Sequence, residues 1–402
     1  MPMDSRVIDS SVSPMRNTAL DYLRAFITVL VVAHHAVLAY HPYAPPLESF
    51  DAGNMMWGAF PIVDAHRAAG IDLFVGFNDA FFMSLMFLLS GLFVWPSLQR
   101  KGTGGFLRDR CLRLGLPFLV AAALLAPLAY YPAWLQRGGE GGIAGFAQAW
   151  LALGVWPAGP AWFLWVLLAF DALAALAFRL APRCADAAGR RIASRSGAAF
   201  FGSLALIAIL AFVPLACLVD ASRWAHFGPF FVQTARILLY ASFFAVGVAL
   251  GAFGIARGVL AADGGLARRW MLWSNLAPVA YFVLVALFIT LLVTNAKGTP
   301  MAGLETATLA AFALSCATSS TAFLALFLRF GQTRRAALDS LSRNAYGIYL
   351  VHYACVSWLQ YALLDFDWPG IAKSVIVFTT ALAASWAIAT TLRRIPAVAR
   401  VI

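Results

Sequence analysis

Charged residues are scarce in this chain of 402 residues: they make up 12% of the sequence, against 62% for hydrophobic residues. A soluble domain carries about 25% charged and about 45–50% apolar residues. One or two water-soluble domains of this length cannot bury so much apolar surface. The composition therefore excludes a cytosolic enzyme and a disordered chain. It predicts an integral membrane protein, with the lipid bilayer as its main surrounding.

Cysteine is also scarce, and the five cysteines are scattered through the chain at positions 111, 184, 217, 316 and 355. None belongs to a C-x-x-C motif or lies near a pair of histidines. This spacing excludes a secreted disulfide scaffold and gives no zinc motif, so we expect no metal site. The 29 basic residues outnumber the 18 acidic ones. In a membrane protein such an excess indicates cytoplasmic loops, so we expect no nucleic-acid partner.

Long apolar runs are what the sequence does contain. A membrane-spanning helix needs about 20 mostly apolar residues, and runs of this length predict helices rather than the shorter strands of a membrane barrel. The expected fold is all-α and polytopic, with about ten transmembrane helices. The runs lie near residues 19–40, 76–95, 113–131, 160–180, 199–219, 232–252, 271–294, 304–328, 345–364 and 371–391.

The basic residues alternate between the connections. Of the 29, 22 lie in one set of connections and four in the other. By the positive-inside rule, both termini face the cytoplasm. We therefore expect a cytoplasmic N-terminal segment (1–18) that is not a cleavable signal, a transmembrane domain (19–392) and a cytoplasmic tail (393–402). The long outer connections 41–75 and 132–159 are either simple connectors or a lid.

Polar residues inside a bilayer are costly, so they point to function. On a helix, Asp21, Arg24, Thr28 and His35 of the first run share a narrow stripe, with Arg24 and His35 separated by about 16 Å along the axis. A histidine can take a proton from a hydroxyl group as a general base. The alternative is that Asp21 and Arg24 anchor the helix at the interface while His35 packs between helices. Both interpretations stay open.

A second basic cluster follows the second run. Arg110 and Arg113, three residues apart, are predicted to share a helix face and to grip a phosphate together, with Arg108 nearby. The alternative is an ordinary basic cytoplasmic loop. Ser90 precedes Gly91 in the second run, but no histidine is placed to activate it as a nucleophile.

Further polar and aromatic residues lie in the later runs. Trp162 belongs either to an aromatic belt at the outer interface or to a sugar-stacking platform. Tyr349 and His352 are neighbours on the ninth run and serve either in packing or as pocket residues. The remaining polar residues of the apolar part are candidates for structural or interior roles: Asp79, Asp171, Arg236 and Glu305.

Taken in order, these motifs resemble the acyltransferase-3 family of integral membrane acyltransferases. The resemblance rests on Leu-Asp-Tyr-Leu-Arg (20–24) followed by His35, Phe-Leu-Leu-Ser-Gly (87–91), and Arg-x-x-Arg (110–113) leading to Pro117. Trp-Phe-Leu (162–164), Tyr-Gly-Ile-Tyr-Leu-Val-His (346–352) and Arg-Ile-Pro (394–396) follow in the expected order. The match covers about residues 19–396. The chain resembles the glucan succinyltransferase branch in its length and in having no extra soluble domain, and it is also similar to polysaccharide O-acetyltransferases.

This resemblance implies a membrane O-acyltransferase. Such enzymes move an acyl group, acetyl or succinyl here, from cytoplasmic acyl-CoA to a hydroxyl of an extracytoplasmic carbohydrate, in the cytoplasmic (inner) membrane of a bacterium. It assigns catalysis to His35 with Arg24 and Asp21, acyl-CoA binding to Arg108, Arg110 and Arg113, and the acceptor pocket to Trp162, Tyr349 and His352. Acyl-CoA is the donor substrate and no metal takes part. The sequence leaves the acyl group, the acceptor and the oligomeric state open.

Two other functions fit ten membrane spans. A secondary transporter of a small polar solute also has charged residues inside the membrane, but such transporters often show inverted repeats and broken helices, which the sequence does not reveal. A non-catalytic scaffold leaves the polar stripe of the first run unexplained, since each central charge costs about 2.5–3.5 kcal/mol.

Overall fold

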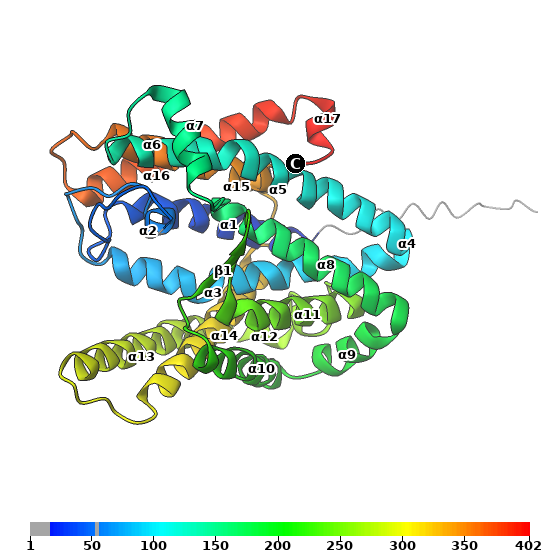
Figure 1. The fold of residues 1–402 in the computed structure, drawn as a ribbon. Coiled ribbons are helices and arrows are strands. Elements are labelled where there is room, and N and C mark those ends of the chain that lie inside the picture. Colours follow the sequence, from blue (N-terminus) through cyan, green and yellow to red (C-terminus); the bar gives the residue numbers. More distant parts are fainter. Residues whose placement is uncertain (1–16, 53–55) are drawn as a thin grey trace, which may run out of the picture.

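The computed structural model describes residues 17–52 and 56–402. The expected cytoplasmic segment 1–18 lies almost entirely outside these residues. The regular secondary structure of the described chain is helical apart from one short hairpin (Figure 1). The helices longer than ten residues are α1 (Thr18–Leu38), α3 (Ile71–Gly91), α4 (Val94–Arg110), α6 (Ala126–Gln136), α7 (Gly142–Ala152), α8 (Trp162–Leu180), α10 (Gly197–Leu218), α11 (Ile237–Phe253), α13 (Trp270–Ala296), α14 (Leu304–Phe330), α15 (Ala336–Ala362) and α16 (Gly370–Leu392).

Shorter elements connect these helices. They are α2 (Met56–Ala59), η1 (Cys111–Gly115), α5 (Leu116–Val120), η2 (Ala121–Leu125), η3 (Gly159–Ala161), α9 (Cys184–Ala193), β1 (Trp224–Phe227), β2 (Phe230–Gln233), η4 (Thr234–Arg236), η5 (Gly258–Leu260), α12 (Gly265–Arg268) and α17 (Pro396–Ala399). The strands β1 and β2 pair antiparallel, with Phe227 opposite Phe230. No sequence pattern had predicted this hairpin.

The predicted all-α, polytopic membrane fold is confirmed. Within the described residues, nine segments are long and apolar enough to cross a bilayer. Each of the ten expected runs is mostly helical, and the run outside this set of nine is 345–364, which lies in α15. This 27-residue helix carries several polar and charged side chains along its length. A helix is therefore present at the remaining expected run, and its polarity explains why nine segments rather than ten count as apolar spans.

The third span differs most from its prediction. The stretch between the second and third expected runs is itself mostly helical, and helical structure covers Val94 to Gln136 with an interruption at Gly102. Gly102 bends this segment, because its φ of 68° lies in the left-handed region that glycine adopts without strain. Two π-helical turns, η1 and η2, follow the bend. A π turn widens the helix locally and rotates the side chains that follow it.

Helix α1 occupies the centre of the bundle. It begins at a side-chain cap, where Asn17 Oδ1 accepts a hydrogen bond from the Leu20 amide at 3.2 Å. It packs against α3, α14, α15 and α16, and Figure 1 shows it between α3 and the α15–α16 pair. Any polar side chain on α1 therefore faces other helices more than lipid.

Close packing of α3 with α11 supports this centre. A Cβ atom on Gly247 would collide with the Leu88 carbonyl oxygen, and one on Gly91 would collide with that of Phe244. Glycine at both positions lets the two backbones approach closely, as small residues do in membrane helix pairs.

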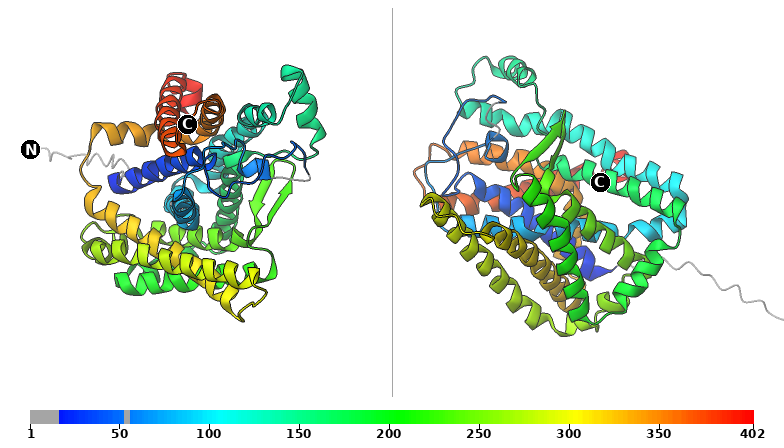
Figure 2. Two further views of the ribbon diagram at one scale, coloured as in Figure 1. Left: turned by 90° about the vertical axis from the view of Figure 1, so that its left-hand side faces the viewer. Right: turned by 60° about the horizontal axis from the view of Figure 1, so that its bottom comes forward.

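The connections lie at two opposite ends of the bundle. The connections from α1 to α3 and from α13 to α14 lie at one end, whereas α9 lies at the other (Figures 1 and 2). This separation matches the alternation expected from the basic residues. The assignment of the α9 end to the cytoplasm remains an expectation from the positive-inside rule.

Candidate active site

His35 and His352 face each other across the interface of α1 and α15. His35 Nδ1 lies 3.2 Å from His352 Nε2, and the ring centroids are 5.1 Å apart. The His352 side chain is fully buried and the His35 side chain is partly exposed. The sequence singled out both residues separately, and the structure brings them into contact.

Helix carbonyls decide which ring nitrogens carry protons. His35 Nδ1 lies 2.8 Å from the Val31 oxygen, and His352 Nδ1 lies 2.7 Å from the Tyr349 oxygen. Since a carbonyl only accepts, each Nδ1 of the neutral pair carries the hydrogen. The His35 Nδ1–H group then donates to two acceptors, the Val31 carbonyl oxygen and His352 Nε2. This tautomer follows from the hydrogen-bond network.

The network leaves one nitrogen open. In this tautomer the lone pair of His35 lies on Nε2, which has no hydrogen-bond partner among the described residues. A general base needs such a lone pair on a neutral imidazole. The geometry therefore gives His35 the form of a base whose second nitrogen is held in place.

Two further side chains hold this end of α1. Gln360 Nε2 donates to the carbonyls of His35 (2.9 Å) and Ala36 (3.1 Å), which belong to the last turns of the helix. The Tyr353 ring stands edge-on to His35 at a centroid distance of 5.1 Å. The hydroxyl of Tyr353 donates to the Gly58 carbonyl oxygen (3.2 Å), so the connection from α1 to α3 covers this site.

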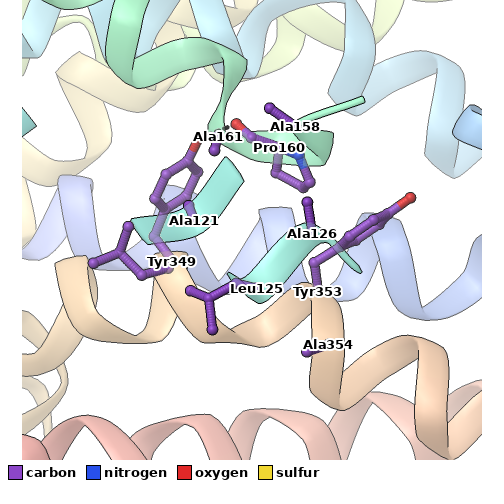
Figure 3. A pocket seen from close by; sticks show the side chains of 10 residues that line it. Ala121, Leu125, Ala126, Ala158, Pro160, Ala161, Tyr349, Tyr353 and Ala354 are labelled. Atoms are coloured by element: carbon purple, nitrogen blue, oxygen red, sulfur yellow. Dashed lines mark hydrogen bonds between the residues drawn. The ribbon is translucent and has the colours of Figure 1, made fainter. Parts of the chain in front are cut away.

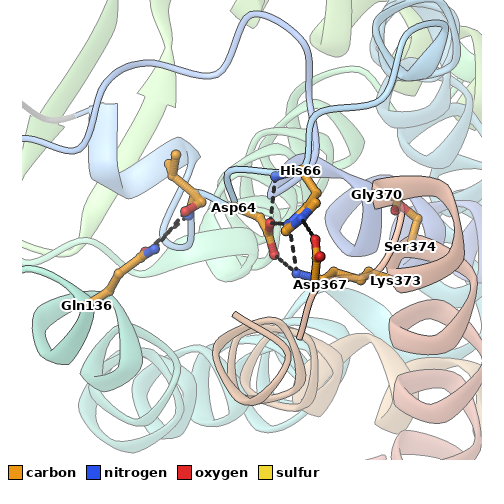
Figure 4. Close-up of polar contacts among 8 residues, drawn as sticks. Asp64, His66, Gln136, Asp367, Gly370, Lys373 and Ser374 are labelled. Carbon is orange, nitrogen blue, oxygen red and sulfur yellow. Dashed lines mark hydrogen bonds and ion pairs between the residues drawn. The ribbon is translucent and has the colours of Figure 1, made fainter. Parts of the chain in front are cut away.

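That connection is fastened to α16 by a buried ion pair (Figure 4). Lys373 Nζ donates to Asp64 Oδ2 at 2.8 Å, and both side chains are about fully buried, at 0% and 1% exposure. His66 Nδ1 lies 3.1 Å from Asp64 Oδ1, and His66 Nε2 lies 2.8 Å from Asp367 Oδ1. Hydrogen bonds with Asp367 and Asp64 raise the pKa of His66 above its usual value. No sequence motif had predicted this cluster.

Asp21 and Arg24 form the expected pair at the other end of α1. Arg24 Nη1 lies 3.7 Å from Asp21 Oδ1, and the guanidinium group lies 5.0 Å from the centroid of the Phe93 ring. Because Arg24 and His35 are separated by about 16 Å along the helix axis, the structure does not bring them together. The two ends of the stripe are two separate sites.

Arg110 is fixed by an acidic residue whose role the sequence left open. Arg110 Nε lies 3.2 Å from Asp171 Oδ2, and the Asp171 side chain is fully buried on α8. The guanidinium group also lies over the Phe106 ring, 5.0 Å from its centroid. This contact orients Arg110 without enclosing it, since its side chain remains 23% exposed.

Arg108 and Arg113 lie in a different environment from Arg110. Both are exposed, and Arg113 belongs to the π turn η1 that follows α4. The prediction that Arg110 and Arg113 share one helix face assumed regular α geometry, which the π turn interrupts. The Tyr346 hydroxyl donates to the Arg113 carbonyl oxygen and so ties this turn to α15.

Figure 3 shows a small cavity lined in part by Tyr349 and Tyr353. The rings of these two tyrosines lie next to those of His352 and His35, at centroid distances of 5.9 and 5.1 Å. The cavity measures about 20 Å³, room for about one water molecule. Tyr349 and Tyr353 form one wall, and both belong to the surroundings of His35 and His352. The Tyr349 hydroxyl donates to the Pro160 carbonyl on the opposite wall. The lining is otherwise apolar: Ala121, Leu125, Ala126, Ala158, Ala161, Leu350 and Ala354.

Trp162 does not line this cavity. Its ring packs in an aromatic cluster with Phe87, Tyr240 and Trp224, at centroid distances of 6.3, 5.6 and 5.8 Å. The structure thus places Tyr349 and His352 beside His35, with Trp162 in a neighbouring packed cluster.

A second ion pair, with Arg236 largely buried and Asp79 partly exposed, lies near His34. Arg236 Nη1 and Nη2 donate to Asp79 Oδ1 (2.9 Å) and Oδ2 (2.6 Å). The His34 ring lies 5.3 Å from that of His35, and its Nδ1 is buried with no hydrogen-bond partner among the described residues. From the sequence, Asp79 and Arg236 were predicted only as separate interior groups. Glu305, predicted as a third such group, is exposed at the start of α14.

Within residues 17–52 and 56–402, no three His, Cys, Asp or Glu side chains are grouped so that they could hold a metal ion.

A family model described as an acyltransferase domain matches residues 17–390, which is nearly the whole chain. No curated protein and no solved structure matches the sequence.

Proposed function

The chain belongs to the acyltransferase-3 family and is a membrane acyltransferase, and we propose that it moves an acyl group from cytoplasmic acyl-CoA to a hydroxyl of an extracytoplasmic carbohydrate. The observation that carries this proposal is the open Nε2 of His35 on the central helix. The proposed location is the cytoplasmic (inner) membrane of a bacterium, where acyl-CoA is available on one face and envelope carbohydrate on the other.

The proposed reaction conserves protons. His35 Nε2 takes the proton of the acceptor hydroxyl while the hydroxyl oxygen attacks the thioester carbon. The new C–O bond forms as the C–S bond breaks, and the departing thiolate takes the proton back from Nε2. His35 is thus neutral before and after each transfer, in keeping with its place between α1 and α15. A route through an acyl-histidine on the same nitrogen is the alternative.

The donor end of the proposal rests on basic side chains. Coenzyme A carries phosphates, which arginine binds through charge-assisted hydrogen bonds. Arg110 is held by Asp171 with part of its side chain exposed, and Arg108 and Arg113 are exposed beside it. Arg24 lies near the N-terminal end of α1, remote from His35, and adds a fourth cation to the proposed donor entrance. Asp21 and Arg24 thereby act at the donor entrance rather than at the reacting atoms.

We propose that the small cavity lined by Tyr353, whose ring contacts His35, accommodates a small, neutral acyl group. Its volume of about 20 Å³ suits an acetyl methyl group better than a longer chain. None of its ten lining residues is cationic, so the carboxylate of a succinyl group would have no partner there. Of the two acyl groups considered, this observation favours acetyl.

The direct test uses labelled acyl-CoA. Inside-out membrane vesicles that contain the protein would be given labelled acetyl-CoA or succinyl-CoA, and the envelope carbohydrate would be analysed by mass spectrometry. We expect acetylated carbohydrate, with loss of thioester, in the absence of an ion gradient. Transport of a solute that needs a gradient, with no thioester cleaved, would instead support the transporter and contradict this proposal.

Removing the donor-side arginines should weaken acyl-CoA binding. Each charged hydrogen bond contributes about 1.5–3 kcal/mol, so the loss of two in R110Q together with R113Q should raise the KM for acyl-CoA by about 100-fold or more. The variant should include D171N, because Asp171 would otherwise stay buried without its cation.

The matched control for this experiment is R268Q with R269Q, which removes two exposed arginines from another connection. It should leave the KM unchanged. An unchanged KM in the R110Q, R113Q and D171N variant, with the protein folded, would refute the phosphate contact.

His352 should act as a positioning residue. In H352F the His35 N–H loses one of its two acceptors, so we expect kcat to fall by about 10–100-fold while the KM for acyl-CoA stays the same. H352Q, which keeps an acceptor, should recover part of the rate. A role in packing alone predicts equal rates for the two variants, since both side chains then only fill space.

A further inference from the structure

A second cavity lies at the opposite end of the bundle from His35, between α15 and α16. Its volume is about 230 Å³, far larger than the about 10–15 Å³ that one water molecule needs. It is lined by Ser340, Arg343, Asn344, Thr390, Arg393 and Arg394. None of these residues belongs to the donor or acceptor sites described above.

The arginines of this cavity are only partly balanced by acidic groups. Arg343 and Arg394 are exposed, and neither guanidinium group has a hydrogen-bond or close ion-pair partner among the described residues. Asp339, which accepts hydrogen bonds from Tyr22 and Arg334, also interacts electrostatically with Arg343. Arg393 Nη1 donates at 2.6 Å to the main-chain oxygen of Ile402, the last residue of the sequence. An anion in the cavity would offset the repulsion that remains among the three cations.

Neutral donors complete the lining. Thr390 Oγ1 is buried and has no hydrogen-bond partner in the described chain. Ser340 Oγ accepts from Trp386 Nε1 at 3.1 Å, so its own hydrogen remains available to donate. A buried hydroxyl without a partner is costly, and a bound oxygen atom would satisfy it.

This combination of guanidinium groups and hydroxyls suits a phosphate group. The surroundings indicate where that phosphate comes from. The Trp386 ring, which contacts the lining residue Ser340, is 40% exposed, and Ile395 beside Arg394 is 50% exposed. Tryptophan and apolar side chains around a basic pocket are typical of the lipid interface.

We propose that this cavity binds the phosphate of an anionic phospholipid from the cytoplasmic leaflet. Basic pockets between membrane helices on this side recognise such headgroups. The lipid then joins α15, which carries His352, to α16, which carries Lys373. The site is independent of the acyl-transfer proposal, since it shares no residue with the donor entrance.

The test compares phosphate sources on the full-length protein in detergent. Phosphatidylglycerol, phosphatidylcholine, coenzyme A and inorganic phosphate would each be titrated and followed by thermal denaturation and native mass spectrometry. We expect phosphatidylglycerol to bind and to raise the melting temperature, with little effect from phosphatidylcholine. In R343Q with R394Q, the Kd for phosphatidylglycerol should rise by about tenfold or more.

Two further variants keep the result decisive. R183Q with R191Q removes two exposed arginines elsewhere and should retain the wild-type affinity. T390V removes only the buried hydroxyl, and it should weaken binding even if the double arginine variant fails to fold. Wild-type affinity in both test variants would overturn the site. A response to coenzyme A that R343Q with R394Q abolishes, without one to the lipid, would overturn the lipid assignment.

Discussion

Replacing His35 by alanine is expected to lower the rate of acyl transfer by about 10²–10⁴-fold, the usual contribution of a general base. The expectation follows from the protonation of the pair: the Val31 carbonyl and His352 engage Nδ1, which leaves the lone pair on Nε2. The measurement is the single-turnover rate of acetyl transfer in vesicles. The KM for acyl-CoA should change little, because the arginines that bind its phosphates lie at the other end of α1.

The matched control is H226A, which removes an exposed histidine from the strand β1. It should keep the wild-type rate. Wild-type transfer by a folded H35A protein would refute the role given to His35. To separate direct transfer from an acyl-histidine, labelled acetyl-CoA can be supplied without acceptor. Label on the peptide that contains His35 would support the covalent route.

The polar stripe of α1 could be predicted from the sequence because it depends only on helical periodicity. Asp21 and Arg24 lie on one helix, so their approach needs no tertiary information. The contact between His35 and His352 joins residues 317 positions apart. The sequence could mark each as a costly polar group in a membrane, yet only the packing of α15 against α1 makes them partners.

Two features near the donor entrance could not be predicted from the sequence. The expected relation between Arg110 and Arg113 assumes a regular α-helix, and no residue type signals the π turn η1 that begins directly after Arg110. Likewise, Asp171 and Arg110 belong to different helices, so their pairing depends on how α8 packs against α4. Residue types thus identified the charges correctly, while helix packing decided which charges meet.

The cluster around Lys373 was missed for a related reason. Lys373 lies in the first turn of α16, where a lysine in sequence looks like an interfacial anchor that reaches water. Its partner Asp64 lies in a long connection, 309 positions away. Only the folding of that connection onto α16 turns an ordinary surface lysine into a buried ion pair that holds the cover of the His35 site.

Replacing Lys373 by methionine should therefore destabilise the protein strongly. The substitution leaves the Asp64 carboxylate buried without its cation, and breaking a buried pair in this way costs about 3–5 kcal/mol. The apparent melting temperature in detergent measures the effect. K101M provides the matched control, because Lys101 pairs with Asp109 on an exposed surface and contributes about 1 kcal/mol or less.

The double variant D64N with K373M separates charge from shape. Removing both charges eliminates the uncompensated carboxylate, so most of the lost stability should return, and equal losses in K373M and in the double variant would contradict this account. His66 supplies a pH test, because its Nδ1 lies 3.1 Å from Asp64 and its pKa is raised. Protonated His66 can replace the missing cation, so the stability lost in K373M should be smaller below the usual pKa of histidine, about 6.5, and should grow as the pH rises above the raised pKa of His66.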